Sequence, residues 1–120
     1  MRILKIGIAT PAEYKERTIA IVKGEFKESK DDPKIWFTSI ESAAKILSHK
    51  NRELLGIISK EKPESVQDLA QLSGRAKSNL SRTLHTMQKY GLIKLEKGKG
   101  KAIVPHALYD KISLELPLVA

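Results

Sequence analysis

The most informative part of the chain runs from Ser65 to Pro105 and reads SVQDLAQLSGRAKSNLSRTLHTMQKYGLIKLEKGKGKAIVP. Ser65 and Asp68 stand three residues apart, a spacing typical of the capped start of a helix. Ser73-Gly74 marks a turn. Apolar residues then recur at helical spacing, at Ala76, Leu80, Leu84 and Met87. These features predict a short helix, a turn and a longer helix over about residues 76–90.

A glycine-containing hairpin follows the longer helix. Gly91 is placed to end that helix in a left-handed conformation. Residues 92–96 and 101–104 have the pattern of short strands, and they flank the loop Lys97-Gly98-Lys99-Gly100. We expect Pro105 to end the second strand. Helix, turn, longer helix and hairpin in this order predict a winged helix-turn-helix.

Basic residues are concentrated in this same part of the chain. Residues 74–101 contain eight basic residues and one acidic residue, a net charge of +7. The remaining 14 bases and 13 acids give +1, so nearly all of the chain's net charge of +8 lies in one segment. A charge run is often only a solvated helix face. Here the run coincides with two elements that fit DNA grooves, which favours binding to DNA phosphates.

The outward face of the longer helix is basic and polar and contains no acid, provided that its four apolar residues face a core. We expect this face to enter the major groove of double-stranded DNA, with its N-terminal half against the base edges. The base-contact candidates are Lys77, Ser78, Asn79, Ser81 and Arg82. The hairpin lysines would bind the backbone without adding sequence information. They are Lys97, Lys99 and Lys101. The other DNA-contact candidates are Ser65, Arg75, His85 and Lys89, of which the first two are expected on phosphates.

Four of these residues also have plain structural interpretations. Arg82 could form a surface ion pair, and Asn79 could cap a helix or fill a polar niche. His85 could be an ordinary surface residue. Lys89 stands at the C-terminal end of its helix, where the helix dipole stabilises a cation.

The first 37 residues predict a strand and a helix. Residues 2–8 alternate as a half-buried strand. Thr10 and Glu13 form a capping box around Pro11, which opens a helix to about Phe26. We expect its buried side to contain Tyr14, Thr18, Ile21, Val22 and Phe26. Trp36, in a short extended piece over 34–37, is expected to be a core or interface aromatic.

Two more helices are expected before Ser65, and one more strand after Pro105. Thr38 and Glu41 have capping-box spacing, which predicts a helix through Leu47. Ser48 is expected to break the chain or cap the next helix, over about 50–60. That helix would bury Leu54, Leu55, Ile57 and Ile58. Residues 111–118 alternate between apolar and other side chains, which predicts a last strand.

The whole pattern predicts an α+β chain in three parts. Residues 1–37 form a strand–helix extension, residues 38–105 the winged helix-turn-helix, and residues 106–120 a C-terminal strand. In one interpretation the two end strands pair within one chain and enlarge the hairpin sheet. In the other, the end strands or the 11–26 helix form a homodimer or hold a toxin protein. For the helix we favour the homodimer, which would set two recognition helices about 34–36 Å apart.

Composition excludes several other classes. The chain contains no cysteine, which rules out disulfides and thiolate metal sites. Its three histidines, His49, His85 and His106, lack metal-ligand spacing. No nucleophile motif or carboxylate cluster is present, so we expect neither an enzyme nor a cofactor. No signal peptide or membrane span is expected, and a cytoplasmic protein is predicted. RNA binding is an alternative, because phosphate contacts discriminate poorly between nucleic acids. The missing set of exposed aromatics for base stacking makes single-stranded targets a poor fit.

Residues 63–93 resemble winged-helix regulators of the MarR and ArsR type. The similarity rests on Leu69-Ala70, on residues 78–84, and on Tyr90-Gly91-Leu92-Ile93 before a basic hairpin. Over about 37–118 the chain is similar to a family of small predicted prokaryotic regulators. The similar segments are Asn51-Arg52-Glu53-Leu54-Leu55, Pro63 with Ser65, Gly74-Arg75 and Tyr109-Asp110-Lys111-Ile112. Members often accompany a TumE-type toxin and are regarded as antitoxins. The resemblance implies a sequence-specific repressor of transcription, with a toxin partner as the alternative function. Metal sensing of the ArsR kind is not expected without cysteine.

Overall fold

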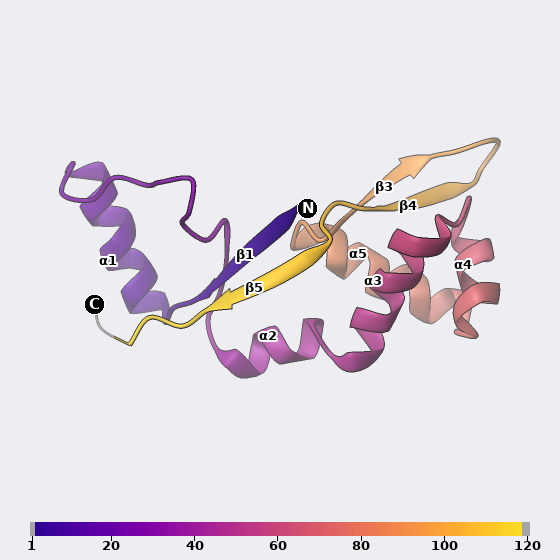
Figure 1. Ribbon diagram of the computed structural model, residues 1–120, viewed down its shortest axis with the longest axis horizontal. Helices are drawn as coiled ribbons and strands as arrows, with labels where there is room; N and C mark the ends of the chain where they lie inside the picture. The colour runs from indigo at the N-terminus through magenta and orange to yellow at the C-terminus, as the bar shows by residue number, and fades with distance from the viewer. Residues whose placement is uncertain (1, 119–120) are drawn as a thin grey trace.

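The computed structural model describes residues 2–118, so residues 1, 119 and 120 of the predicted end segments lie outside the described part. The described chain is elongated, with extents of 49 × 26 × 25 Å. Three helices and a hairpin occupy one end, and a lone helix occupies the other (Figure 1). A three-stranded sheet lies between them (Figure 1).

The three consecutive helices are α3 (His49–Glu61), α4 (Val66–Ser73) and α5 (Lys77–Lys89). Ser48 caps α3 and Ser65 caps α4, each accepting a hydrogen bond from a backbone N–H of the first turn, as expected. Gly74 ends α4 at φ 72° and makes the tight turn into α5. Ala76 is exposed and precedes α5, so its expected place on the inner face was wrong.

The hairpin consists of β3 (Ile93–Lys97) and β4 (Ile103–Ala107), which pair antiparallel. The expectation that Pro105 ends the second strand was wrong. Pro105 lies inside β4, opposite Leu95. The ladder tolerates this proline because β4 is an edge strand of a two-stranded sheet. The N–H of Leu95 donates to Oε1 of Gln88 on α5, at 2.7 Å. Helices α3 to α5 and this hairpin form a winged helix-turn-helix, in an α+β chain.

The end strands pair with each other. β1 (Ile3–Ile8) lies between β2 (Ile35–Phe37) and β5 (Lys111–Glu115), and both neighbours run parallel to it. The expectation of pairing within one chain is therefore confirmed. The expectation that these strands enlarge the hairpin sheet was wrong. They form a separate three-stranded sheet with β2, and the hairpin stays two-stranded.

Helix α1 (Pro11–Val22) contributes no residue to the core. The capping box of Thr10 and Glu13 is present. The helix ends before Phe26, and its expected buried side stays largely exposed, with Val22 at 81%. Helix α2 (Ile40–Ile46) is capped by Ser39 and Ser42 rather than by Thr38 and Glu41, because these two hydroxyls satisfy each other's backbone N–H groups.

One apolar core joins the sheet to the winged helix-turn-helix. Leu4 and Ile6 of β1 share it with Leu54 and Ile58 of α3 and with the inner face of α5. Leu55 and Ile57, also expected inside, are only partly buried. Phe37 of β2 stacks on Tyr90 at the end of α5, with ring centroids 4.8 Å apart. The sheet is thus anchored directly against the C-terminal end of α5.

Candidate nucleic-acid interface

Helix α5 has one buried face and one polar face. Leu80, Leu84 and Met87 are at most 1% exposed, so they fix which way the helix is turned. The remaining candidate residues of this helix are all exposed: Lys77, Ser78, Asn79, Ser81, Arg82, His85 and Lys89. No acidic residue occurs between Lys77 and Lys89. The polar face is therefore cationic along its whole length.

The N-terminal end of α5 carries no side-chain cap. Ala76 holds the capping position and has no side chain that could accept a hydrogen bond. The first turn also lacks an acid, unlike that of α4, where Asp68 fills this role. Backbone N–H groups at a helix start and the positive end of the helix dipole both favour an anion. The first turn of α5 thus presents positive charge from its backbone as well as from Lys77.

Ion pairs are few among the described residues, and most bases within residues 2–118 form none. Arg2, Lys5 and Arg17, at the end with the parallel sheet, each lie within 4.0 Å of a carboxylate oxygen. In the basic segment, only Lys94 has such a neighbour, Glu96 at 3.3 Å. Along residues 2–118 the other seven bases of that segment form no ion pair: Arg75, Lys77, Arg82, Lys89, Lys97, Lys99 and Lys101. Their charge is not neutralised by the protein itself.

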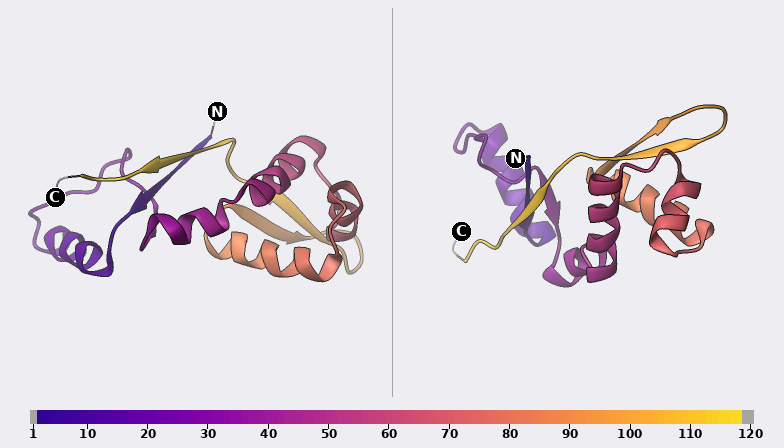
Figure 2. Two further views of the ribbon diagram at one scale, coloured as in Figure 1. Left: turned by 90° about the horizontal axis from the view of Figure 1, so that it is seen from below. Right: turned by 45° about the vertical axis from the view of Figure 1, so that its right-hand side comes forward.

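The hairpin carries three exposed lysines, Lys97, Lys99 and Lys101, around a tight loop. Gly98 lies so near β4 that an added Cβ would approach Cγ2 of Val104 to 2.7 Å. Gly100 has φ 63°, a conformation that side chains rarely adopt. Both glycines are therefore required by the loop geometry. The hairpin projects beyond the helices (Figure 2), where a long ligand would reach it.

Three candidate residues already take part in local contacts. Ser65 Oγ accepts a hydrogen bond from the Asp68 N–H at 3.0 Å as the cap of α4. Arg75 is half-buried, with Nη1 3.5 Å from Oδ1 of Asn51 on α3. His85 Nδ1 lies 2.7 Å from the Ser81 carbonyl oxygen, which only accepts, so Nδ1 carries the proton. Arg75 is thus the candidate most engaged in holding the turn between α4 and α5.

Two positioning residues were not expected from the sequence. Gln88 holds β3 against α5 through its hydrogen bond with Leu95. Asn51 links Arg75 to the end of α2, since its Nδ2 donates to the Ile46 carbonyl at 3.0 Å. Neither residue gives a sequence signal for these contacts, because the partners belong to other parts of the fold: Leu95 lies on β3, and Arg75 lies in the turn before α5.

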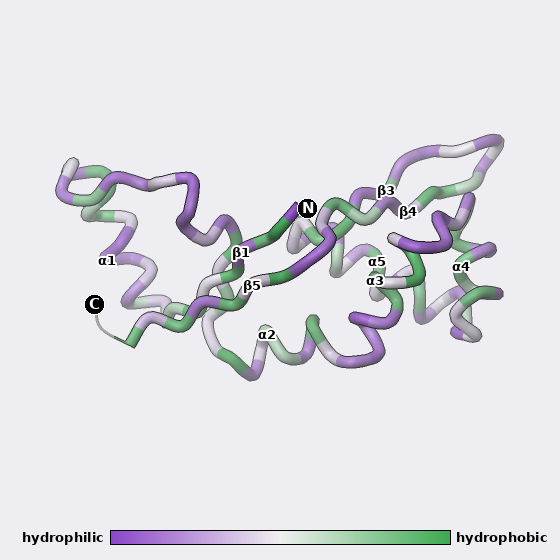
Figure 3. The backbone as a smooth tube through the Cα atoms, in the orientation of Figure 1, coloured by the Kyte–Doolittle hydropathy of each residue, from purple (hydrophilic) through white to green (hydrophobic). Residues whose placement is uncertain are grey.

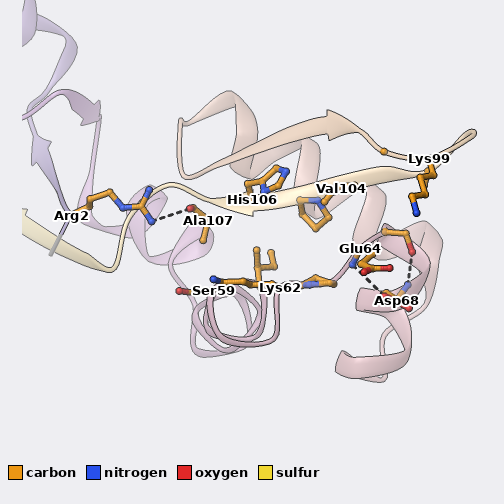
Figure 4. Close-up of a pocket in the computed structure, with 15 residues that line it drawn as sticks. Arg2, Ser59, Lys62, Glu64, Asp68, Lys99, Val104, His106 and Ala107 are labelled. Carbon is orange, nitrogen blue, oxygen red and sulfur yellow. Dashed lines mark hydrogen bonds between the residues drawn. The ribbon is translucent and has the colours of Figure 1, made fainter.

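A cleft of about 700 Å³ lies between β4 and the turn that joins α3 to α4 (Figure 4). Its lining is mixed in charge, with Arg2, Lys62 and Lys99 beside Glu64 and Asp68. Asp68 accepts a hydrogen bond from the Glu64 N–H at 3.2 Å. Glu64 and Asp68 therefore line this cleft and do not lie on the exposed face of α5.

Within residues 2–118 there is neither a cluster of metal ligands nor a membrane-spanning helix. Nowhere in that range do three or more His, Asp or Glu side chains gather as metal ligands would. No helix in the same range is long and apolar enough to cross a membrane.

Comparison with known proteins identifies the family. The profile of the family named HVO_A0114 matches residues 46–114, more than half of the chain. The chain belongs to the HVO_A0114 family. The match runs from the end of α2 into β5, so it includes the winged helix-turn-helix and the last strand of the sheet. The name HVO_A0114 states no activity, so the function has to be inferred from the residues.

The chain is also similar to solved structures. A crystal structure described as the predicted DNA-binding transcriptional regulator from E. coli matches with a TM-score of 0.49 and 24% identity. The match covers 58% of this chain and 74% of that chain. No curated protein matches the chain.

Proposed function

We propose that this HVO_A0114 protein binds double-stranded DNA and regulates transcription. The observation that carries the proposal is the charge of α5, the turn before it and the hairpin. Residues 74–101 hold eight bases and one acid, and seven of these bases form no ion pair within residues 2–118. Cations left unpaired by their own protein favour a polyanion, and each phosphate that they neutralise releases a condensed counterion. The same charges scattered over the surface would support only non-specific attraction.

In this proposal α5 lies in the major groove, which is about 12 Å wide and admits a helix. Arg82 is the candidate for a bidentate contact with guanine, and Asn79 for one with adenine. Lys77 and the uncapped first turn would hold a phosphate at the groove edge. Exposed serines at positions 78 and 81 complete the face without adding a negative charge.

The hairpin serves as a wing on the DNA backbone. Lys97, Lys99 and Lys101 provide charge there, and Gly98 and Gly100 keep the loop narrow enough to approach a phosphate. Such contacts add affinity for every sequence equally. Gln88 ties this wing to α5, so the backbone contact and the base contact would be held in one geometry.

We propose repression by occupancy, with two copies acting as a dimer on a two-fold symmetric site. A small protein bound over a promoter excludes polymerase without any further activity. The antitoxin function implied by the resemblance requires a protein-binding surface separate from α5 and the wing. The edge of β5, where Leu114 is exposed, is such a surface.

The direct test is a gel-shift titration against the chain's own upstream region and a random duplex of equal length, at two salt concentrations. The proposal predicts tighter binding to the upstream region, by a factor of about 10³ or more. Both duplexes should bind more weakly at the higher salt. Equal affinity for the two duplexes would overturn specific regulation, and no binding to either would overturn DNA binding altogether.

A further inference from the structure

The chain exposes more surface than a folded monomer of its size. Its accessible surface is 8641 Å², whereas a 13.4 kDa monomer is expected to expose about 6,500 Å². Its radius of gyration is 16.6 Å, against about 14 Å for a compact domain of 120 residues. The excess, about 2,100 Å², is larger than the roughly 800 Å² that each partner buries in a standard interface. The surface therefore has room for a stable dimer contact.

Most of the exposed large apolar side chains lie at the end away from the wing. Among the described residues eleven such side chains are exposed. Eight of the eleven lie in three places: in β1, in α1 with the turn after it, and in β5 with the residues that follow it. Three are leucines spaced two apart at the C-terminal end: Leu114, Leu116 and Leu118. Figure 3 shows this apolar run continuing from β5 toward the C-terminus.

β5 is an edge strand of the parallel sheet, since β1 pairs with it on one side only. Its five residues read Lys111-Ile112-Ser113-Leu114-Glu115. Two copies aligned antiparallel about Ser113 would set each Lys111 opposite the partner's Glu115. They would also set each Ile112 opposite the partner's Leu114. The strand is thus complementary to itself in charge and in hydrophobicity, which is what a two-fold contact requires.

We propose that two copies of this chain dimerise by antiparallel pairing of their β5 edges, which joins the two sheets into one of six strands. The proposal rests on the dimer put forward above and names its surface. Lys111 is exposed, and within residues 2–118 it has no carboxylate neighbour. Glu115 keeps 43% of its side chain exposed although Lys5 Nζ lies 3.8 Å away. Both ends of the predicted cross-strand ion pair are therefore accessible.

This arrangement has a consequence for the recognition helices. Leu4 and Ile6 of β1 share a core with α5, so one face of the sheet packs on the winged helix-turn-helix. A two-fold axis perpendicular to the sheet keeps equivalent faces on the same side, so both winged units lie on one side of the six-stranded sheet. Phe37 stacks on Tyr90 at the end of α5, so the joined sheet would fix the distance between the two helices.

The test is the mass of the full chain without DNA, by sedimentation equilibrium at micromolar concentration. The wild type should be a dimer. Lys111→Glu places two glutamates opposite each other at both symmetric positions, and we expect the dimer dissociation constant to rise about tenfold or more. Adding Glu115→Lys to that variant restores opposite charges across the axis and should recover the dimer. This recovery also shows that Lys111→Glu did not act by unfolding.

Two substitutions on α1 serve as matched controls. Lys15→Glu reverses an exposed charge, and Val22→Asp places an acid on an 81% exposed apolar site. Both should remain dimeric, whereas Leu114→Asp should not. A monomeric wild type overturns the proposal, including any assignment of this surface to a second copy. A dimer that survives Lys111→Glu but not Val22→Asp moves the interface to α1 and overturns the β5 contact while leaving DNA binding unaffected.

Discussion

Arg82 and Lys99 are both exposed cations, but the elements that carry them differ. Arg82 lies on the groove face of α5, and Lys99 lies on the wing loop. We expect Arg82→Ala to cost about 1–3 kcal/mol on the preferred site and to relax the preference at one base pair. Lys99→Ala should weaken binding to every duplex about equally. It should also make the slope of log K against log salt shallower by about 0.9, the contribution of one phosphate contact.

Fluorescence anisotropy with one specific and one random duplex separates these two effects. Lys15→Ala on α1 is the matched control, since it removes an exposed charge far from both elements. The docking described above fails if Arg82→Ala and Lys99→Ala both leave affinity and salt dependence unchanged.

Two glycines of the helical unit should respond to alanine in opposite directions. Gly74 has φ 72°, where alanine is strained by about 1–2 kcal/mol, although no atom lies within 4 Å of the added Cβ. Gly56 lies inside α3 with no positive φ and an equally open Cβ position. Gly56→Ala should therefore stabilise the protein by about 0.5–1 kcal/mol. Urea unfolding measures the free energy of unfolding of both variants. A more stable Gly74→Ala protein would contradict the left-handed turn at Gly74.

At the scale of elements, α1 depends on its capping box. The Thr10 N–H donates to Oε1 of Glu13 at 2.9 Å, and this bond, together with the Thr10 hydroxyl, holds the pKa of Glu13 below its ordinary value of 4.5. The carboxylate therefore stabilises the helix fully above pH 4.5, and this contribution is lost as pH falls through the lower folded pKa. An NMR titration of Glu13 should show the lowered pKa. In Thr10→Gly, where the hydroxyl is gone, the pKa should move back toward 4.5.

The wing depends on Gln88. Its side chain supplies the acceptor for the Leu95 N–H. Gln88→Ala should leave that N–H without a protein acceptor, and its hydrogen exchange should become faster. Gln88→Glu retains an acceptor oxygen and should preserve the protection. Unchanged exchange in Gln88→Ala would mean that β3 is held to α5 by packing alone.

Local patterns predicted most elements but not their partners. Helical spacing in α5 and the serine caps of α3 and α4 are set by neighbouring residues, and they were confirmed. The strand positions of β1 and β5 were also predictable, but their alternation is equally compatible with the hairpin sheet and with each other. Pairing with β2 depends on Trp36, whose ring covers Gly7 so closely that an added Cβ would lie 2.5 Å from it. No local pattern reports such a contact.

The misplaced buried side of α1 has a related cause. Helical periodicity marks apolar residues such as Tyr14 and Val22 as one face of a helix but does not state whether anything covers them. Arg17 of α1 lies against two aromatic rings outside the helix, with its guanidinium 5.0 Å from the Trp36 ring and 5.3 Å from the Phe26 ring. The exposed positions of the candidate residues on α5 could be predicted, because charge and outward position on a helix are both local properties.

At the scale of the molecule, DNA contacts and self-association are assigned to opposite ends. A cluster of bases with a single acid lies on α5 and the wing, and most of the exposed large apolar side chains lie around β1, α1 and β5. The parallel sheet connects the two, through the core that Leu4 and Ile6 share with α5. A dimer built on β5 would therefore present two basic faces to one duplex, about one helical turn apart.

The central claim is that the seven bases of residues 74–101 that form no ion pair within residues 2–118 meet DNA phosphates. The dependence of the binding constant for a duplex on salt concentration tests it most directly, since each phosphate contact adds about −0.9 to the slope of log K against log salt. If at least four of the seven make such contacts, the slope per chain should be about −3.5 or steeper. A slope near zero, or no binding at low salt, would contradict the account.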